Sequence, residues 1–308
     1  MGKPVTNRCP APNSGFRLTE MTHTPAKLAQ LPFVKAHGTG NDFVVVDAVA
    51  HTVNFESQQV ADLCHRHTGI GADGLLRIAL ASDFQIADAN YFMDYRNADG
   101  SVAETCGNGL RVFARMLIEL GYEQVGSFTI GTRAGTVTAT VDPQDAEFAN
   151  IAIEMGSPQL SSDSLTVGVS TESGTFSGVP VFMPNPHCVV IVDDAADAGS
   201  LHTAPVLDAE GVFPQGANVE FISRTAADHI TMRTYERGVG ETLSCGSGAC
   251  AAAAVWAREE GLELPWTVQI DVLGGTVYVD CNESGILTLR GPAQIVAQGT
   301  MLGDSWTI

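Results

Sequence analysis

The strongest constraint on this chain is a short motif that occurs twice: a cysteine followed directly by Gly-x-Gly and then by a run with helical character. A thiol at a helix N-terminus lies beside unsatisfied N–H groups and the positive end of the helix dipole. We therefore expect each thiol to have a lowered pKa, and each helix start to bind a carboxylate or phosphate group. The repetition suggests two matched thiols around one anionic substrate. The copies are Cys106-Gly107-Asn108-Gly109, before residues 110–117, and Cys245-Gly246-Ser247-Gly248, before residues 249–256.

The predicted secondary structure repeats together with this motif. Each half of the chain has several expected strands and one main helix, which is typical of an α+β fold rather than of alternating βαβ units. Two similar domains with the site in the cleft between them are the simplest architecture. We expect an N-terminal extension over 1–32, an N-terminal domain over 33–149 completed by 291–308, and a C-terminal domain over 150–290.

The expected strands are short runs bounded by turn residues. A short helix is expected over 57–67, with Ser57 as its N-cap and Gly69 as its stop. The expected strands are 33–37, 42–47, 75–79, 90–96, 128–130, 136–141, 151–155, 179–183, 188–192, 217–222, 229–236, 267–272, 276–279 and 286–290.

Composition excludes several classes of protein. The 308 residues carry a net charge of −19, which argues against binding to the phosphate backbone of nucleic acids. No segment approaches the roughly 18 apolar residues of a membrane span, and residues 1–32 lack the apolar region of a secretory signal. The seven cysteines are scattered, which favours free thiols in a reducing cytoplasm over a disulfide scaffold.

Lysine usage argues against pyridoxal phosphate as a cofactor. An enzyme that uses this cofactor needs a Schiff-base lysine inside its fold. The chain has only Lys3, Lys27 and Lys35, and the first two lie upstream of the first expected strand. We expect no cofactor.

Other motifs point to chemistry that their context disfavours. Residues 69–74 match G-x-G-x-x-G, but a helix precedes them and a strand follows, the reverse of the dinucleotide fingerprint, so we expect a turn close to the ligand. Cys64, His65 and His67 lack the second pair of ligands that zinc requires. The two histidines are expected at a helix end, Cys250 is expected as a small core residue, and no metal site is expected.

A redox role for Cys106 and Cys245 is a stronger alternative. Two facing thiols of low pKa can cycle between dithiol and disulfide. The usual redox motif, Cys-x-x-Cys beside a βαβ unit, is absent from the sequence. We expect a disulfide between them only as an oxidative lesion.

The chemistry we favour is inversion of a carbon stereocentre. Without a cofactor, one group must remove a proton from one face while another delivers a proton to the opposite face. Two cysteines at helix starts in two domains supply such opposed faces. The N–H groups of Gly107, Asn108, Gly246 and Ser247 are placed to stabilise charge on the substrate carboxylate.

Several motifs, in order and in register from about Phe33 to the C-terminus, resemble those of diaminopimelate epimerase. The resemblance implies two pseudo-symmetric domains, each a mixed β-sheet or barrel around a central helix. It also implies conversion of LL- to meso-diaminopimelate without pyridoxal phosphate or metal, on the route to lysine and peptidoglycan, by a homodimer. The motifs are residues 37–43, 97–100, 106–109, 185–188, 217–219 and 235–242 leading into 245–248.

The resemblance also assigns roles to individual residues. The two catalytic thiols fall on Cys106 and Cys245, and His187 and Glu236 fall where the family has side chains that tune the thiols. Substrate contacts carry over to Asn41, Asn97, Gly107, Asn108, Asn185, Asn218, Glu236, Arg237, Gly246 and Ser247.

Physical chemistry agrees with part of this assignment. Arg237 lies in a Gly-rich loop and suits bidentate capture of the second carboxylate of a two-ended substrate. Asn97 also fits an ordinary Asx turn, and His187 also fits a satisfied interior histidine. Two positions depart from the pattern of the family. Many relatives have a substrate-contacting Gln where Gly74 stands, and some relatives have a Tyr near the position of Ala297 that takes part in a dimer contact.

Two other functions stay open. The same scaffold suits racemisation of proline or hydroxyproline, although Arg237 and the asparagines favour a longer substrate with two ends. The alternative outside the isomerases is a protein that performs thiol redox chemistry, or that binds a carboxylate without converting it to a product.

Overall fold

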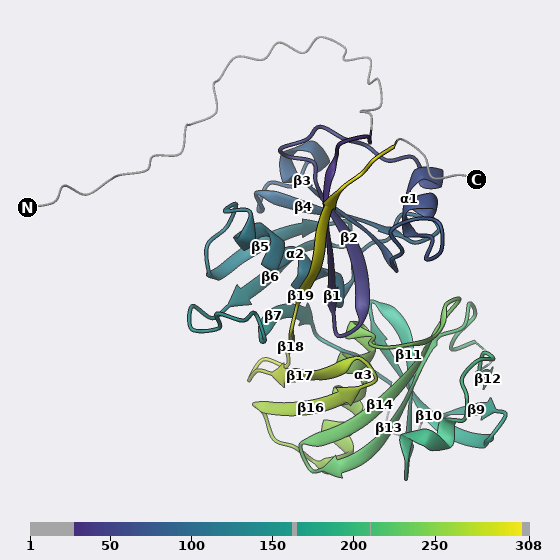
Figure 1. Ribbon diagram of the computed structural model, residues 1–308. Coiled ribbons are helices and arrows are strands. Elements are labelled where there is room, and N and C mark those ends of the chain that lie inside the picture. The colour runs from purple at the N-terminus through teal and green to yellow at the C-terminus, as the bar shows by residue number, and fades with distance from the viewer. Residues whose placement is uncertain (1–27, 162–164, 210, 304–308) are drawn as a thin grey trace, which may run out of the picture.

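A computed structural model describes residues 28–161, 165–209 and 211–303. Its described part is an α+β fold of nineteen strands in one continuous hydrogen-bonded sheet, with three α-helices. Figure 1 shows two lobes, one built around helix α2 and the other around helix α3. The expected fold class is confirmed.

The first lobe contains most elements of the N-terminal half and the last strand of the chain (Figure 1). These are β1 (Pro32–Gly38), β2 (Asn41–Asp47), α1 (Ser57–Cys64), β3 (Gly74–Leu80), the 3-10 helix η1 (Ala81–Phe84), β4 (Tyr91–Asn97), α2 (Gly107–Glu119), β5 (Gly126–Thr132), β6 (Gly135–Val141), β7 (Ile151–Gly156) and β19 (Gln294–Thr300).

The second lobe follows the same plan, with strands around one long helix (Figure 1). Its elements are β8 (Gln159–Leu160), β9 (Val167–Thr171), β10 (Gly174–Met183), β11 (Asn185–Val192), the 3-10 helix η2 (Ala195–Ala198), β12 (Val206–Asp208), β13 (Asn218–Ala226), β14 (His229–Glu236), β15 (Gly240–Thr242), α3 (Gly246–Glu260), β16 (Trp266–Val272), β17 (Gly275–Cys281) and β18 (Leu287–Gly291).

Each main helix is buried against its own sheet. Leu110, Phe113 and Leu117 of α2 are at most 1% exposed and pack against the strands of the first lobe. The Ala-rich run of α3, residues 249–254, is buried in the second core, where small side chains let the sheet approach closely. Gly261 ends α3 in the left-handed conformation, at φ 65°, which glycine adopts without steric cost.

Helix α1 is shorter than the sequence predicts and begins differently. It ends at Cys64 instead of His67 because His65 has an extended backbone. The Nδ1 atom of His65 accepts hydrogen bonds from the following turn, including the amide of Thr68, which confirms its place at the helix end. The N-cap is Glu56, one residue before the expected Ser57, in a capping box with Gln59.

Three strands connect the lobes and the chain ends. Strand β19 pairs antiparallel with β1, so the last strand belongs to the first lobe. Strand β7 pairs with both β6 and β18, and its Ile151 and Ile153 pack in the core around α2. The lobes are therefore continuous through β7 and β18, and the expected boundary at residue 150 stays a prediction.

The expected N-terminal extension, residues 1–32, lies only partly within the described residues. Leu28 and Leu31 are buried, and the amide of Gln30 donates to Met301 O at 2.7 Å, so residues 28–32 are part of the packed fold and not of a loose extension. Residues 1–27, like residues 304–308 of the expected N-terminal domain, lie outside the described residues. Over the described ranges, no helix has the length and apolarity needed to cross a membrane.

Candidate active site

Both cysteines of the repeated motif occupy the N-cap position of a main helix. Cys106 precedes α2 with an extended backbone, and its Sγ accepts a hydrogen bond from the amide of Gly109 at 3.4 Å. Cys245 precedes α3 in the same way, and its Sγ lies 3.7 Å from Ser247 Oγ. The expectation of a thiol at each helix start is therefore met.

The two helix starts meet each other. A Cβ atom added to Gly246 would lie 3.3 Å from Gly107 Cα and 3.4 Å from Asn108 N, so the glycines let the two backbones touch. Asn108 Nδ2 donates to Ser244 O at 2.9 Å, which ties α2 to the segment before α3. Segments from the two halves of the chain thus bring Cys106 and Cys245 to one place.

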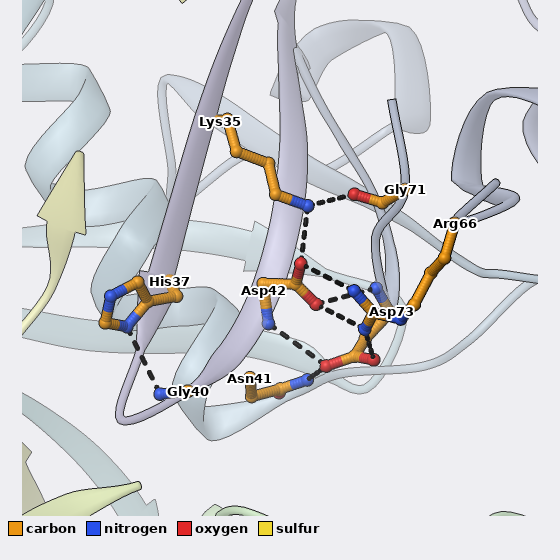
Figure 2. Close-up of polar contacts among 8 residues, drawn as sticks. All are labelled: Lys35, His37, Gly40, Asn41, Asp42, Arg66, Gly71 and Asp73. Carbon is orange, nitrogen blue, oxygen red and sulfur yellow. Dashed lines mark hydrogen bonds and ion pairs between the residues drawn. The ribbon is translucent and has the colours of Figure 1, made fainter. Parts of the chain in front are cut away.

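Asn41, expected to bind substrate, lies against the Cys106 helix start. Its Oδ1 is 3.5 Å from Cys106 Sγ and 3.4 Å from Asn108 Nδ2. Its Nδ2 donates to Asp73 Oδ2 at 2.8 Å (Figure 2), which fixes the orientation of the amide.

Asp73 belongs to a network of charged groups beside the hairpin of β1 and β2 (Figure 2). Arg66 bridges Asp73 and Asp42, and Lys35 binds Asp42 and Gly71 O. Lys35 is therefore engaged in a structural ion pair. The hydrogen bonds from Arg66 and Lys35 outweigh burial and hold the pKa of Asp42 far below its ordinary value. Residues 69–73 form bends that lead into β3, whose first residue is Gly74, and the expected approach of this segment to a ligand stays a prediction.

A chain of polar groups, buried at its His187 and Glu220 end, leads to Cys245. His187 and Glu220 are both 0% exposed, and His187 Nδ1 lies 2.8 Å from Glu220 Oε1. His187 Nε2 lies 3.0 Å from Asn185 Oδ1, and Asn185 Nδ2 donates to Ser247 Oγ at 3.2 Å. The contacts join the expected residues Asn185, His187 and Ser247 to Cys245.

Glu236 acts on both thiols. Its Oε1 accepts a hydrogen bond from Thr242 Oγ1 at 2.6 Å. Burial raises the pKa of Glu236, and its negative charge raises the pKa of Cys106 and of Cys245. Glu236 is thus the carboxylate common to both halves of the site.

The remaining predicted residues lie around this centre. Asn218 Oδ1 accepts from the amide of Arg237 at 2.9 Å, and Arg237 Nη1 donates to Gln215 O at 3.2 Å. Arg237 and Asn185 line a cavity of about 420 Å³. The Asn97 amide donates to Ser101 Oγ at 3.0 Å in the turn after β4, and among the described residues no hydrogen bond joins it to either cysteine.

The expected lowering of the thiol pKa values is wrong for this structure. Burial raises the pKa of Cys106 to about 11, although the amide of Gly109 and the cation of Arg111 act in the opposite direction. Burial, followed by Glu236 and Glu220, raises the pKa of Cys245 well above its ordinary value. The loss of water outweighs the helix N-terminus here, because a thiolate needs solvation more than a thiol does.

The Gln that the resemblance leads us to expect in place of Gly74 has no room in this structure. A Cβ at this position would lie 2.5 Å from Arg96 O and 2.7 Å from the ring of Tyr95. Tyr95 is only 8% exposed and packs edge-to-face on Phe43, so its ring cannot move aside at low cost. Tyr95 therefore occupies space that a Gln side chain would need.

Three residues near the thiols escaped the sequence analysis: Asp73, Arg111 and Glu220. Their partners are distant in sequence: Asn41 is 32 residues from Asp73, and Pro292 is 181 residues from Arg111. The sequence held one signal for Glu220, because it is a charged residue inside the otherwise apolar strand expected over 217–222. Within the described ranges, no cluster of three or more His, Cys, Asp or Glu side chains is arranged to hold a metal ion.

Comparison with known proteins decides the family. The model of the family described as diaminopimelate epimerase matches residues 33–161 and 180–296. The chain belongs to this family of isomerases. The diaminopimelate epimerase of Streptomyces coelicolor is 40% identical over 280 residues, covering 88% of this chain and 95% of its own. That of Corynebacterium glutamicum is 41% identical over 278 residues, covering 87% and 97%.

Solved structures with low sequence identity share the fold. A PhzF-family phenazine biosynthesis protein of Bacillus anthracis superposes with a TM-score of 0.64 at 18% identity, over 88% of this chain and 99% of its own. A hydroxyproline epimerase of Agrobacterium vitis, with bound trans-4-hydroxy-L-proline, gives 0.63 at 15% identity, over 89% and 93%. This chain thus shares its fold with proteins of other named activities.

Proposed function

We propose that the protein is a cofactor-independent epimerase that interconverts LL- and meso-diaminopimelate with Cys106 and Cys245 as its acid–base pair. The observation that carries the proposal is the meeting of two helix N-termini, each capped by a cysteine, where Gly246 approaches Gly107. Family membership supports the choice of substrate.

The reaction needs one proton removed and one delivered. The thiolate of one cysteine takes the α-hydrogen as a proton, which leaves the electron pair on the α-carbon and its carboxylate. The thiol of the other cysteine then protonates that carbon from the opposite face and becomes the thiolate. The reverse reaction exchanges the two roles. General acid–base catalysis of this kind contributes about 10²–10⁴-fold in rate.

The first turns of α2 and α3 stabilise the charge that develops on the substrate. In this proposal the N–H groups of Gly107, Asn108, Gly246 and Ser247 bind the carboxylate at the reacting end. The distant end of the substrate, with its own carboxylate and ammonium group, is held by polar side chains from both lobes. These are Asn41, Asn97, Asn185, Asn218, Glu236 and Arg237.

We also propose a homodimer in a reducing cytoplasm, acting on the route to lysine and peptidoglycan. Strand β19 supports the dimer, since Ile295 and Val296 beside Ala297 are 36% and 61% exposed. The six cysteines in the described part of the chain are free thiols, which suits a reducing compartment. The pairing of β19 with β1 supports a first domain over 33–149 that is completed after residue 291, with 150–290 as the second domain.

A substrate panel tests the proposed function. LL-diaminopimelate, L-proline and trans-4-hydroxy-L-proline are incubated with the enzyme, and the stereoisomers are separated by chiral chromatography. We expect conversion of LL-diaminopimelate alone. Conversion of either proline substrate, without conversion of LL-diaminopimelate, would contradict the assigned substrate. If no substrate were inverted at any stereocentre, epimerisation itself would be contradicted.

A further inference from the structure

Arg111 is a buried hydrogen-bond donor that joins three segments of the chain. It lies in α2 and is 0% exposed. Its Nε donates to Pro292 O at 3.2 Å, in the segment between β18 of the second lobe and β19 of the first. Its Nη2 donates to Thr39 Oγ1 at 3.1 Å, in the turn between β1 and β2. Because a guanidinium presents its donors in a fixed planar fork, this side chain holds both segments at a set distance from α2.

Thr39 extends this connection to the second lobe. Since its Oγ1 accepts the hydrogen bond from Arg111, its own O–H is left to donate to Ser244 Oγ at 2.8 Å. Ser244 directly precedes Cys245, and its carbonyl oxygen accepts from Asn108 Nδ2 at 2.9 Å. Arg111, Thr39, Ser244 and Asn108 are at most 3% exposed, so water does not compete for these bonds. Two hydrogen bonds from the first lobe therefore hold the residue before the second thiol.

The turn between β1 and β2 fits closely between the lobes. Figure 1 shows the closed end of this hairpin extending towards the second lobe. On one side, a Cβ on Gly38 would lie 3.0 Å from Asn108 O of α2. On the other side, a Cβ on Gly274 would lie 1.8 Å from Thr39 O, and the amide of Gly274 donates to Leu243 O at 2.9 Å. The turn thus separates the start of α2 from the segment before α3 by a fixed thickness.

Thr39 is held in a conformation that its residue type rarely adopts. Its φ of 49° lies in the left-handed region, where a β-branched residue is an outlier and glycine is favoured. The amide of Gly40 donates to His37 Nδ1 at 3.2 Å and closes the turn (Figure 2). Such conformations persist where the surrounding structure fixes them, most often at functional sites. A threonine at this position indicates that the two hydrogen bonds of its hydroxyl have a role beyond the turn itself.

We propose that Arg111, Thr39 and Ser244 are positioning residues, which set the place of Cys245 relative to Cys106 through one hydrogen-bonded chain. The proposal rests on the proposed two-cysteine mechanism, because it assigns these residues to the geometry of proton transfer and not to contact with the substrate. Arg111 belongs to the helix that Cys106 caps, and Ser244 is joined to Cys245 by a peptide bond. A break in the chain changes the separation of the two helix starts.

Replacement of Thr39 tests the chain at its middle. Thr39→Val removes the hydroxyl and keeps the β-branched shape, whereas Thr39→Ser keeps the hydroxyl. The full chain is assayed with LL-diaminopimelate, and kcat and KM are measured separately. We expect Thr39→Val to lower kcat by about tenfold or more, with a smaller change in KM, since a misplacement of about 1 Å costs on the order of 10²-fold. Thr39→Ser is expected to keep the wild-type kcat.

Thr132 provides the matched control, because it is another buried threonine of the first lobe. It is 1% exposed, and its Oγ1 donates to Gly135 O at 2.7 Å. Thr132→Val is expected to lower the Tm and to keep the wild-type kcat. The proposal is overturned if Thr39→Val and Thr132→Val have the same kcat, or if Thr39→Ser loses as much kcat as Thr39→Val.

A double-mutant cycle asks whether Thr39 and Ser244 act through the same hydrogen bond. Ser244→Ala removes the acceptor of that bond. We expect the variant with both Thr39→Val and Ser244→Ala to lose no more kcat than the more severe single variant, because partners in one contact are not additive. Losses that multiply would show two independent effects and would contradict the chain. If Thr39→Val does not fold, Ser244→Ala decides against the same control, and an unchanged kcat then overturns the proposal.

Failure of this proposal differs from failure of the proposed function. A wild-type enzyme that does not turn over LL-diaminopimelate, or a Cys106→Ala variant that does, contradicts the two-cysteine epimerase and the positioning role with it. Turnover that depends on Cys106 and not on the hydroxyl of Thr39 removes the positioning role alone.

Discussion

The starts of α2 and α3 have the same local sequence pattern and different polar surroundings. Each has a cysteine N-cap and a glycine that allows the other backbone to approach. At Cys106, the amide of Gly109 donates to Sγ and Asn41 Oδ1 lies 3.5 Å away. At Cys245, Sγ lies beside the Ser247 hydroxyl, and the buried carboxyl group of Glu220 lies against Gly248. A repeated motif thus fixes the positions of two groups, while their neighbours give each group different polar contacts.

Removal of either thiol is the most severe way to test this pairing. Cys106→Ala and Cys245→Ala are each expected to lower kcat by about 10³-fold or more, because each removes one proton-transfer group. Steady-state kinetics with LL-diaminopimelate measure the loss. Cys250→Ala is the matched control, since this buried thiol lies on α3 away from the helix start, and we expect it to retain activity. An equal loss in Cys250→Ala would mean that any cysteine change disrupts the fold.

The contact between helix starts is tested by adding one methyl group at each glycine. In both variants the new Cβ meets the end of the Leu289 side chain, but in Gly246→Ala it also meets the backbone of Gly107 and Asn108, whereas in Gly107→Ala it otherwise meets the flexible end of Met155. We expect about 10²-fold loss of kcat/KM for Gly246→Ala, as for a misplacement of about 1 Å, and a smaller loss for Gly107→Ala. Circular dichroism checks the fold. The reverse order of losses would show that the backbones do not meet as described.

Loss of a single polar contact at each thiol gives a smaller effect. Asn41→Ala removes the acceptor at Cys106, and Ser247→Ala removes the hydroxyl beside Cys245. Each is expected to lower kcat/KM by about tenfold, the worth of one hydrogen bond. Because a catalyst does not change the equilibrium constant, the losses must be equal for the LL-to-meso and meso-to-LL directions. No change in either variant would contradict the placement of these side chains.

The raised thiol pKa values predict loss of stability at alkaline pH. The unfolded chain ionises its thiols near pH 9, while folded Cys106 ionises near pH 11, so the folded state holds a proton that the unfolded state has lost. The contribution of Cys106 to stability is therefore complete below pH 9 and declines as the pH rises towards 11. Thermal melts over this range should show a shallower decline in Cys106→Ala, and a still shallower one in Cys245→Ala. A wild-type Tm that does not fall would contradict the burial of these thiols.

Local sequence signals predicted most of the fold. Strands with alternating apolar residues and the two main helices were found because their patterns lie within short windows. Strand β19 was missed because five of its first six residues are exposed, so it has no apolar face, and pairing with β1 at the other end of the chain supports it. Helix α1 was predicted too long because the turn made by His65 has no periodic signal.

The candidate site was predicted from motifs, but its electrostatics were not. The positions of Cys106 and Cys245 follow from the local helix starts, whereas their pKa values depend on water exclusion by the whole fold. A helix N-terminus is visible in sequence and burial at a domain contact is not, which explains the wrong sign of the expected shift. The same reason hid Arg111, whose partners Thr39 and Pro292 come from distant segments.

The central claim is that two thiols act on opposite faces of one carbon. Its most direct test is the early reaction of LL-diaminopimelate in deuterated water, followed by mass spectrometry and proton NMR of both isomers. We predict that the first meso product carries deuterium at the inverted carbon while the recovered LL substrate carries none, because the acid that protonates the product has exchanged with solvent. Product that retains the substrate's own hydrogen would contradict the account, since a single group would then have moved one proton from face to face.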